Sequence, residues 1–228
     1  MITLINTLPE ASFPSAEYIR LKCLFDCYKD DKDVLFWEQD GGKAYFSLAG
    51  GDMTVFCEKG DTDEIKEFIS VISPGSIFGS LKVLERIGLK GVHSVYVMSR
   101  KADILGETLG DSLKSREFYD ILNVKEFSLP EYPYFAVDLC RRLNRGLGDY
   151  FAIRDKCAAV SFHTGDYALL NGIVSREKGL GTVALKAILQ KNYGRELLIC
   201  CEENLIGFYE KNGFKKLYKA GYRCKQQA

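Results

Sequence analysis

A glycine-containing segment between a predicted strand and a predicted helix has the residue types of a phosphate-binding loop. It runs from Val174 to Gly181 and reads Val-Ser-Arg-Glu-Lys-Gly-Leu-Gly. Gly179 and Gly181 place no side chain over the first helical turn, so backbone N–H groups there can point at an anion, which the helix dipole also attracts. Arg176 and Lys178 add positive charge for the same phosphates. The segment predicts a site for a phosphorylated ligand.

A tyrosine in the segment Asn204–Phe214 has the chemistry of a general acid. Tyr209 lies five residues beyond Asn204, inside a predicted short helix, where its hydroxyl can donate a proton to a bound ligand. The alternative is that Tyr209 is a core aromatic residue beside Phe208, and the general acid is the favoured hypothesis. Asn204 is a candidate N-cap of this helix.

Hydrophobic periodicity and turn residues predict the elements that position these two segments. Val183, Ala184, Ala187 and Ile188 recur at helical spacing directly after the glycine segment. In chain order, we expect a strand at 121–129, a helix at 133–145 introduced by Pro130 and Pro133, strands at 149–155, 158–164 and 167–174, a helix at 179–192, a strand at 196–202, a helix at 204–212 and a strand at 214–223.

The first half of the chain repeats this pattern. Four residues recur 114 positions later in the sequence: Ala44, Ser47, Gly51 and Asp52 return as Ala158, Ser161, Gly165 and Asp166. Their order and spacing favour a duplicated unit over coincidence, which divides the chain into a first repeat, 1–120, and a second repeat, 121–228. In the first repeat we expect a helix at 14–29, strands at 33–39, 43–49 and 53–58, a helix at 62–72 with Thr62 or Asp63 as its N-cap, a strand at 76–80, a helix at 81–87, a strand at 92–98 and a connector at 102–120.

The glycine loop, followed by an apolar strand and a helical Phe-Tyr pair, resembles the GCN5-related N-acetyltransferase (GNAT) superfamily in a tandem form. The resemblance rests on sequence motifs in residues 121–223, and on the order of the predicted strands and helices in residues 14–101. It implies a mixed α/β fold of two tandem GNAT-like units, each a mostly antiparallel central sheet flanked by helices. The resemblance also implies a coenzyme A site formed by Ile173, Val174, Arg176, Glu177, Lys178, Gly179, Leu180, Gly181, Thr182, Asn204 and Phe208, with Tyr209 as the catalytic acid.

By the same resemblance, the expected reaction is transfer of an acyl group, acetyl in the first place, from acetyl-CoA to an amine of a small molecule or peptide. Strands that separate after residues 173 and 201 would accept the pantetheine arm, and backbone N–H groups near Asn171 to Val174 would bind its amides. The sequence does not identify the general base. No carboxylate lies between Leu169 and Val174, and the remaining candidates are turn residues: Glu202, Glu203, His163 and Asp166.

Two features of this sequence depart from the pattern of the superfamily. The segment before Arg176 lacks the common Pro-acid-aromatic step, and Asn204 stands closer to Tyr209 than is typical. Both shorten the segments that would hold the acyl group, while the phosphate-binding loop keeps its glycines.

The first repeat is predicted to have lost the coenzyme A site. At the position of the glycine loop it carries four acids that would repel a pyrophosphate and take up the N–H donors of the helix: Glu58, Asp61, Asp63 and Glu64. Leu84 precedes Glu85 where Tyr209 precedes Glu210. We therefore expect the first repeat to be structural or to form walls of the acceptor site.

Composition limits the other classes of protein. The 31 basic and 31 acidic residues give a formal net charge of zero, which disfavours a nucleic-acid partner. Eight cysteines without a C-x-x-C pair, and only two histidines, disfavour a metal site and indicate reduced thiols. Neither a signal peptide nor a membrane-spanning run is visible, so a cytoplasmic location is expected, and the oligomeric state is left open.

Two alternatives to the enzyme stay open. One is a binding protein that holds coenzyme A without turning it over, which would tolerate replacement of Tyr209. The other is an aminoacyl-tRNA-dependent transferase resembling the Fem ligases, which also pair two such units. Zero net charge and the intact glycine loop disfavour this second alternative.

Overall fold

The computed structural model describes residues 1–10, 13–127 and 129–224. The chain forms two compact units, which are described separately. Unit 1 comprises Met1–Met98 and the segment that starts at Cys200, and unit 2 comprises Ser99–Ile199. These units differ from the division into repeats at residue 120, because the end of the second repeat packs in unit 1. The repeat boundary stays a prediction about the sequence.

The sheet of unit 1 has the strand order β1-β2-β3-β4-β5-β11-β6. Its pairs are antiparallel along β1-β2-β3-β4, parallel between β4 and β5, and antiparallel between β5 and β11. The strands are β1 Ile2–Leu4, β2 Val34–Gln39, β3 Ala44–Ala49, β4 Asp52–Cys57, β5 Ser76–Ser80, β11 Lys215–Cys224 and β6 His93–Lys101, which begins in unit 1. The helices are α1 Ala16–Tyr28, α2 Thr62–Ile72, α3 Leu81–Arg86 and α7 Ile206–Lys211, the last preceded by a 3₁₀ turn, η1 Glu203–Leu205.

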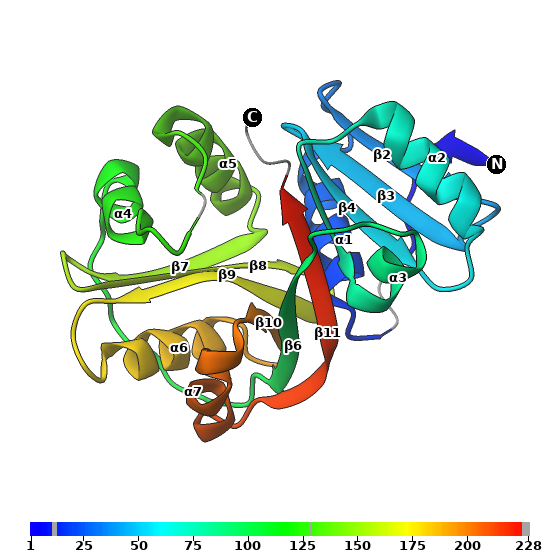
Figure 1. Ribbon diagram of the computed structural model, residues 1–228. Coiled ribbons are helices and arrows are strands. Elements are labelled where there is room, and N and C mark those ends of the chain that lie inside the picture. The colour runs from blue at the N-terminus through cyan, green and yellow to red at the C-terminus, as the bar shows by residue number, and fades with distance from the viewer. Residues whose placement is uncertain (11–12, 128, 225–228) are drawn as a thin grey trace. The chain divides into compact units, whose positions relative to one another are not determined.

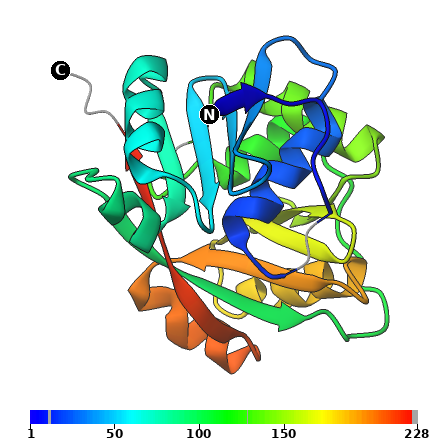
Figure 2. The same ribbon diagram turned by 90° about the vertical axis from the view of Figure 1, so that its right-hand side faces the viewer.

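Helices cover both faces of this sheet, because side chains alternate between the faces along each strand. On one face, Phe46 and Val55 pack with Ile65 of α2 and Leu84 of α3. On the other face, aromatic residues of the strands pack against Tyr18, Leu21 and Phe25 of α1. Figure 2 shows α1 in dark blue and α2 in cyan on the two sides of these strands.

Unit 2 is built on the strand order β10-β9-β8-β7. Its strands are β7 Gly148–Ile153, β8 Cys157–Thr164, β9 Tyr167–Ser175 and β10 Glu196–Cys201, which begins in unit 2. Its helices are α4 Ser115–Leu122, α5 Tyr132–Asn144 and α6 Leu180–Lys191. The β7-β8 and β8-β9 pairs are antiparallel and the β9-β10 pair is parallel. In Figure 1, α4 and α5 lie on one face of these strands and α6 on the other. The predicted mixed α/β class, with mostly antiparallel sheets flanked by helices, is confirmed.

The two units share an order of strands and helices that matches the sequence repeat. β3, β4, α2 and β5 in unit 1 follow one another as β8, β9, α6 and β10 do in unit 2, and the last two strands are parallel in both. Ser47 and Ser161 are both buried in matching strands. Gly51 and Gly165 both turn the chain with positive φ, 87° and 50°. The final strand departs from a simple tandem order, because β11 of the second repeat pairs with β5 of the first.

Three expectations about local structure were wrong. The strand expected at 121–129 is replaced by the end of α4, because Phe118, Ile121 and Leu122 bury one helical face; residue 128 lies outside the described residues. Asp61, and not Thr62 or Asp63, is the N-cap of α2. The helix expected at 204–212 is divided into η1 and α7, so Asn204 lies in the 3₁₀ turn and Leu205 is the N-cap of α7.

Candidate functional site

The parallel pairing in unit 2 ends before β9 does. β9 and β10 pair from Tyr167 and Glu196 to Leu170 and Ile199, which is earlier than the expected separation after residues 173 and 201. Directly after the last of these pairs, Asn171 has no partner residue on β8 and forms a β-bulge. Bulges commonly lie next to functional sites because they redirect the backbone groups of one strand. Ile173 and Val174, both half-buried, follow this bulge on the way to the glycine loop.

The glycine loop forms an open helix start. Gly179 is the N-cap of α6 with φ 90°, a conformation that a residue with a side chain rarely adopts. Among the described residues, the backbone N–H groups of Lys178, Gly179 and Gly181 have no acceptor. A Cβ built on Gly179 would meet nothing within 4 Å, so the position where a side chain would stand is free of protein. Unpaired donors at a helix start, facing open space, fit an anion such as a pyrophosphate.

Side chains on either side of these glycines hold the loop in place. The guanidinium of Arg176 donates to the backbone oxygens of Asp120, at 3.0 Å, and Asp155, at 3.3 Å. Glu177 pairs with Lys156 at 3.1 Å. Arg176 therefore ties the loop to α4 and to the β7-β8 turn, a role that the sequence did not predict, and its other donors stay available to a phosphate.

The remaining residues predicted for the loop lie on or beside it. Lys178 is exposed and forms no ion pair within the described residues. Leu180 begins α6 and is half-buried, and the exposed Thr182 donates its N–H to the Gly179 oxygen at 3.1 Å. The structure thus brings the predicted residues 173–182 together around one helix start in unit 2.

The equivalent helix start in unit 1 is filled by its own side chains. The Asp61 carboxylate accepts from the N–H groups of Asp63, at 3.0 Å, and Glu64, at 3.3 Å. Gln39, fully buried, bonds both the Asp61 backbone N–H and the Glu64 side chain. A Cβ on Gly60 would stand 2.4 Å from the Gln39 Oε1. The donors that stay open in α6 are satisfied within the protein in α2, as the acids of this segment predicted.

Removal of this cap gives a measurable test of the filled helix start. Asp61→Ala deletes the acceptor for two N–H groups and is expected to lower the free energy of unfolding by about 0.5–2 kcal/mol, measured by urea denaturation. Asp63→Ala, in the same exposed first turn, is the matched control and is expected to change stability by less. Equal losses in the two variants would show that Asp61 acts by charge alone.

Tyr209 lies in α7 of unit 1 and is only 5% exposed. Its ring packs edge-on against Phe208 and Phe214, with centroid distances of 5.0 and 5.5 Å. The hydroxyl forms no hydrogen bond within the described chain. Its oxygen is not one of the side-chain atoms that are both fully buried and without a partner. Burial raises the pKa of Tyr209 further above neutral pH, where a tyrosine already keeps its proton. Asn204 is exposed in η1, and Phe208 is half-buried beside Tyr209.

The candidate bases fall into two groups. His163 and Asp166 border the β8-β9 turn, where β9 begins, about 20 Å along that strand from Val174. They are not brought together with the glycine loop. In unit 1, Glu202 accepts from His93 at 2.8 Å, and Tyr96 donates to Glu203 at 3.5 Å. His93, which the sequence did not indicate, lies 109 positions from Glu202, so no local pattern shows the pair.

Solved structures match this architecture over most of the chain. A GCN5-related N-acetyltransferase from Kribbella flavida is 12% identical, with a TM-score of 0.56 over 82% of this chain and 88% of that chain. A tandem GNAT protein from the clavulanic acid biosynthesis pathway is 12% identical, with a TM-score of 0.53 over 96% and 91%. A GCN5-related N-acetyltransferase from Sphaerobacter thermophilus is 12% identical, with a TM-score of 0.52 over 85% and 81%.

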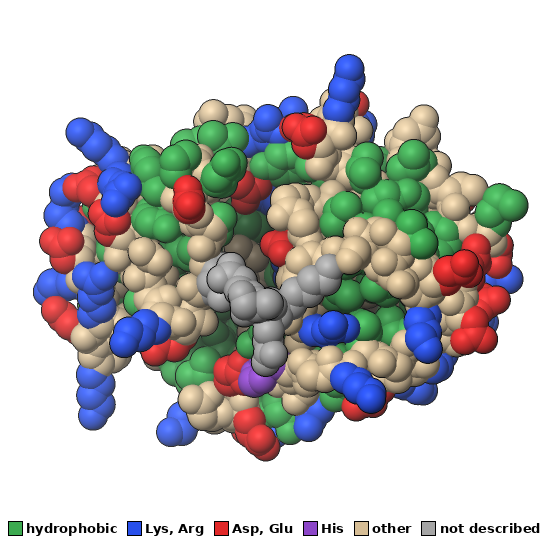
Figure 3. Space-filling view, turned by 45° about the horizontal axis from the view of Figure 1, so that its top comes forward, with side chains coloured by type: hydrophobic (Ala, Val, Ile, Leu, Met, Phe, Trp, Pro, Cys, Tyr) green, Lys and Arg blue, Asp and Glu red, His purple; other side chains and the backbone are tan. Residues whose placement is uncertain are grey.

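The chain has the GNAT fold. No family sequence model matches it, and a search of curated proteins found no match. Across the described part of this GNAT-fold chain, no helix has the length and apolarity to cross a membrane. The same residues hold no group of three or more His, Cys, Asp or Glu side chains that would bind a metal ion. On the face in Figure 3, basic and acidic side chains are intermixed.

Proposed function

We propose that this protein is an acetyl-CoA-dependent N-acyltransferase that acts on an amine. The observation that carries the proposal is the open start of α6, where three N–H groups lack an acceptor within the described residues and Gly179 faces free space. The filled start of α2 supports it, because the same element in the other repeat has closed the site with its own acids. The solved structures that share the fold support a general acetyltransferase function.

The loop residues have complementary roles toward the coenzyme. In this proposal, the N–H groups of Gly179 and Gly181 donate to the pyrophosphate, and Lys178 neutralises part of its charge. The β9 backbone from Asn171 to Val174 is no longer paired with β10 and offers N–H groups to the pantetheine amides. One of these donors would also polarise the thioester carbonyl, because charge develops on its oxygen as the amine attacks.

The reaction needs two proton transfers, and we assign a residue of this chain to the second, the protonation of the leaving thiolate. The amine forms a C–N bond with the acyl carbon, the C–S bond breaks, and the sulfur leaves as a thiolate. Tyr209 would give its hydroxyl proton to that thiolate, and the excess proton of the amine would pass to water or to an acceptor such as Glu202. Tyr209 carries its proton at neutral pH, as a donor must, although burial raises its pKa and so makes it a weaker acid than a solvated tyrosine.

A coenzyme A-binding protein without turnover is the second candidate. The packing of Tyr209 between two aromatic rings favours it, since a tyrosine buried to this degree also serves as a core residue. This candidate keeps the glycine loop and assigns Tyr209 no chemistry.

Calorimetry and thiol release distinguish the two candidates. Titration with acetyl-CoA is expected to give one site per chain, because the α6 start is open while Asp61 fills the equivalent start of α2. Two sites per chain would contradict the argument from the acids of α2. With bound acetyl-CoA, a panel of amines is expected to release free thiol; binding without release from any amine would favour the binding protein.

A further inference from the structure

A pocket in unit 1 has no part in the proposed function. It has a volume of about 260 Å³, close to the lower end of the roughly 300–1,000 Å³ that small-molecule sites span. The end of α2, the start of β5, the residues at and after the end of α3, and the end of β11 meet around it. Its lining includes Ile69, Ile77 and Ile87, all three buried in the core of this unit. The pocket therefore has an apolar inner wall.

Two basic residues line the same pocket. Lys66 belongs to α2 and is exposed, and Arg223 belongs to β11 and is half-buried. Arg223 lies opposite Ile77 in the register of β11 with β5, so both side chains are on the face of the sheet that α2 and α3 cover. Neither basic side chain forms a hydrogen bond or an ion pair with the described residues. The pocket thus combines an apolar wall with two cations that have no counter-ion in the described part of the chain.

The balance of charge around the pocket favours an anion. No aspartate or glutamate is among the described residues that line it, and Glu67, next to Lys66 on α2, forms no ion pair with either cation. The ends of α2 and α3 each contribute a partial negative charge of at most about half an elementary charge. At α3 the carbonyls of Val83, Leu84 and Glu85 already accept from the N–H groups that follow the helix. The two full positive charges therefore exceed the charge of the helix ends.

The equivalent place in unit 2 is occupied by the chain itself. The connector after β6 crosses the end of α6, where Gln190 accepts from the Thr108 hydroxyl at 2.6 Å and donates to the Leu105 oxygen at 3.5 Å. At the start of this connector, Ala102 forms two backbone hydrogen bonds of 2.8 Å with the turn after α6. At the end of the equivalent helix α2, Ser70 and the residues after it line the pocket instead. The chain covers this place in one unit and presents two cations there in the other.

We propose that this pocket binds a small apolar carboxylate, with the carboxylate on Arg223 and Lys66 and the carbon skeleton against the isoleucine wall. A guanidinium can donate to both oxygens of a carboxylate through parallel N–H bonds, and an ammonium adds a further donor. Contact with the wall removes the apolar part of the ligand from water, which favours an organic anion over an inorganic one. A cationic guest would be repelled by both side chains, and a neutral guest would leave them without a counter-ion.

Two probes of one shape test the charge that the pocket selects. Benzoate and benzyl alcohol are titrated by calorimetry at neutral pH without coenzyme A, so failure of the acyltransferase proposal does not affect the result. Benzoate is expected to bind at least tenfold more tightly than benzyl alcohol. Equal binding of the two probes, or no binding of benzoate, would overturn the proposal.

Substitution of the two cations tests where benzoate binds. Arg223→Gln removes the guanidinium and is expected to lower benzoate affinity at least tenfold, or about 1.4 kcal/mol. Lys66→Gln should lower it by less, because Lys66 is more exposed. Lys82→Gln, an exposed cation on α3 that does not line the pocket, is the matched control and should leave the affinity unchanged. Wild-type affinity in both folded pocket variants would overturn the assignment. So would loss of benzoate binding in Gly181→Glu, because it would place the anion at the start of α6.

A second pair of variants leaves both cations in place and covers a loss of folding in Arg223→Gln. Ser70 is exposed on α2 and lines the pocket, so a changed side chain there can reach solvent. Ser70→Asp adds a negative charge beside the two cations and is expected to weaken binding of benzoate. Ser70→Asn is of the same size but neutral and should weaken it less. Equal benzoate affinities in these two variants would contradict an anion in the pocket.

Discussion

Replacement of Tyr209 by phenylalanine is expected to lower kcat roughly 10²–10⁴-fold, the usual effect of removing a positioned general acid. The change keeps the ring and its edge-on contacts with Phe208 and Phe214. The hydroxyl forms no hydrogen bond within the described chain, so the free energy of unfolding and the affinity for acetyl-CoA should hardly change. The loss should therefore appear in kcat, because the proton moves during the reaction and not on binding.

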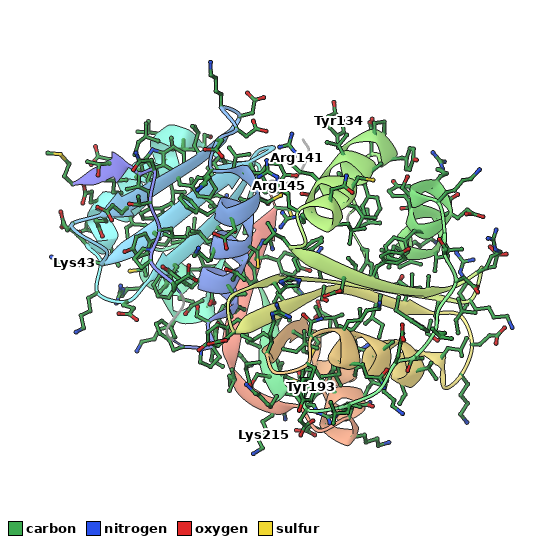
Figure 4. The ribbon with its side chains drawn as sticks, turned by 180° about the vertical axis from the view of Figure 1, so that it is seen from behind. Lys43, Tyr134, Arg141, Arg145, Tyr193 and Lys215 are labelled. Atoms are coloured by element: carbon green, nitrogen blue, oxygen red, sulfur yellow. The ribbon has the colours of Figure 1, made fainter. Side chains whose placement is uncertain are left out.

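The pH dependence and a control variant separate this role from packing. Burial raises the pKa of Tyr209 above its ordinary 10.0, so the acid form persists and wild-type kcat should not fall through deprotonation of this tyrosine at pH 9. Tyr193→Phe is the control, because Tyr193 is 54% exposed in the turn after α6 (Figure 4). If Tyr209→Phe turns over at the wild-type rate, Tyr209 is a core residue and the thiolate takes its proton from water.

The elements of the repeats could be predicted because their signals are local. The strands and helices from β2 to β6 and from α5 to β11 begin and end within a few residues of the predicted bounds, since alternation, helical spacing and glycine turns mark them. The expected strand at 121–129 was wrong because its apolar residues also fit the helical face that α4 buries. The pairing of β11 with β5 joins the ends of the two repeats, and nothing in either segment specifies that partner.

The candidate site was predicted to a different degree in each unit. Both helix starts depend on residues that are adjacent in the sequence. The open start of α6 follows from its glycines, and the filled start of α2 follows from the acids in the same place of the first repeat. The bonds of Arg176 to the Asp120 and Asp155 oxygens depend on how α4 and the β7-β8 turn pack, which local sequence does not record. The hydrogen bond of Tyr218 to Glu17 joins residues 201 positions apart, so no local pattern in the sequence indicates it.

Substitution of Gly179 by glutamate is expected to lower the affinity for acetyl-CoA at least tenfold, or about 1.4 kcal/mol. The new side chain would project into the free space beside Gly179 and bring a negative charge to the proposed pyrophosphate site. It would also force a residue with a Cβ into a φ of 90°, which costs stability whether or not a ligand is bound. The experiment must therefore separate the loss of binding from the strain.

Gly194 provides the control for that strain. It lies beyond the other end of α6, with a φ of 89°, and a Cβ there would also meet nothing within 4 Å. Gly194→Glu should therefore destabilise the protein by a similar amount, measured by thermal unfolding, while calorimetry shows wild-type affinity for acetyl-CoA. Gly181→Glu, inside the first turn of α6, should weaken binding without the strain of a positive φ. If Gly179→Glu and Gly194→Glu bind acetyl-CoA equally well, the start of α6 does not hold the coenzyme, and the acyltransferase proposal loses the observation that carries it.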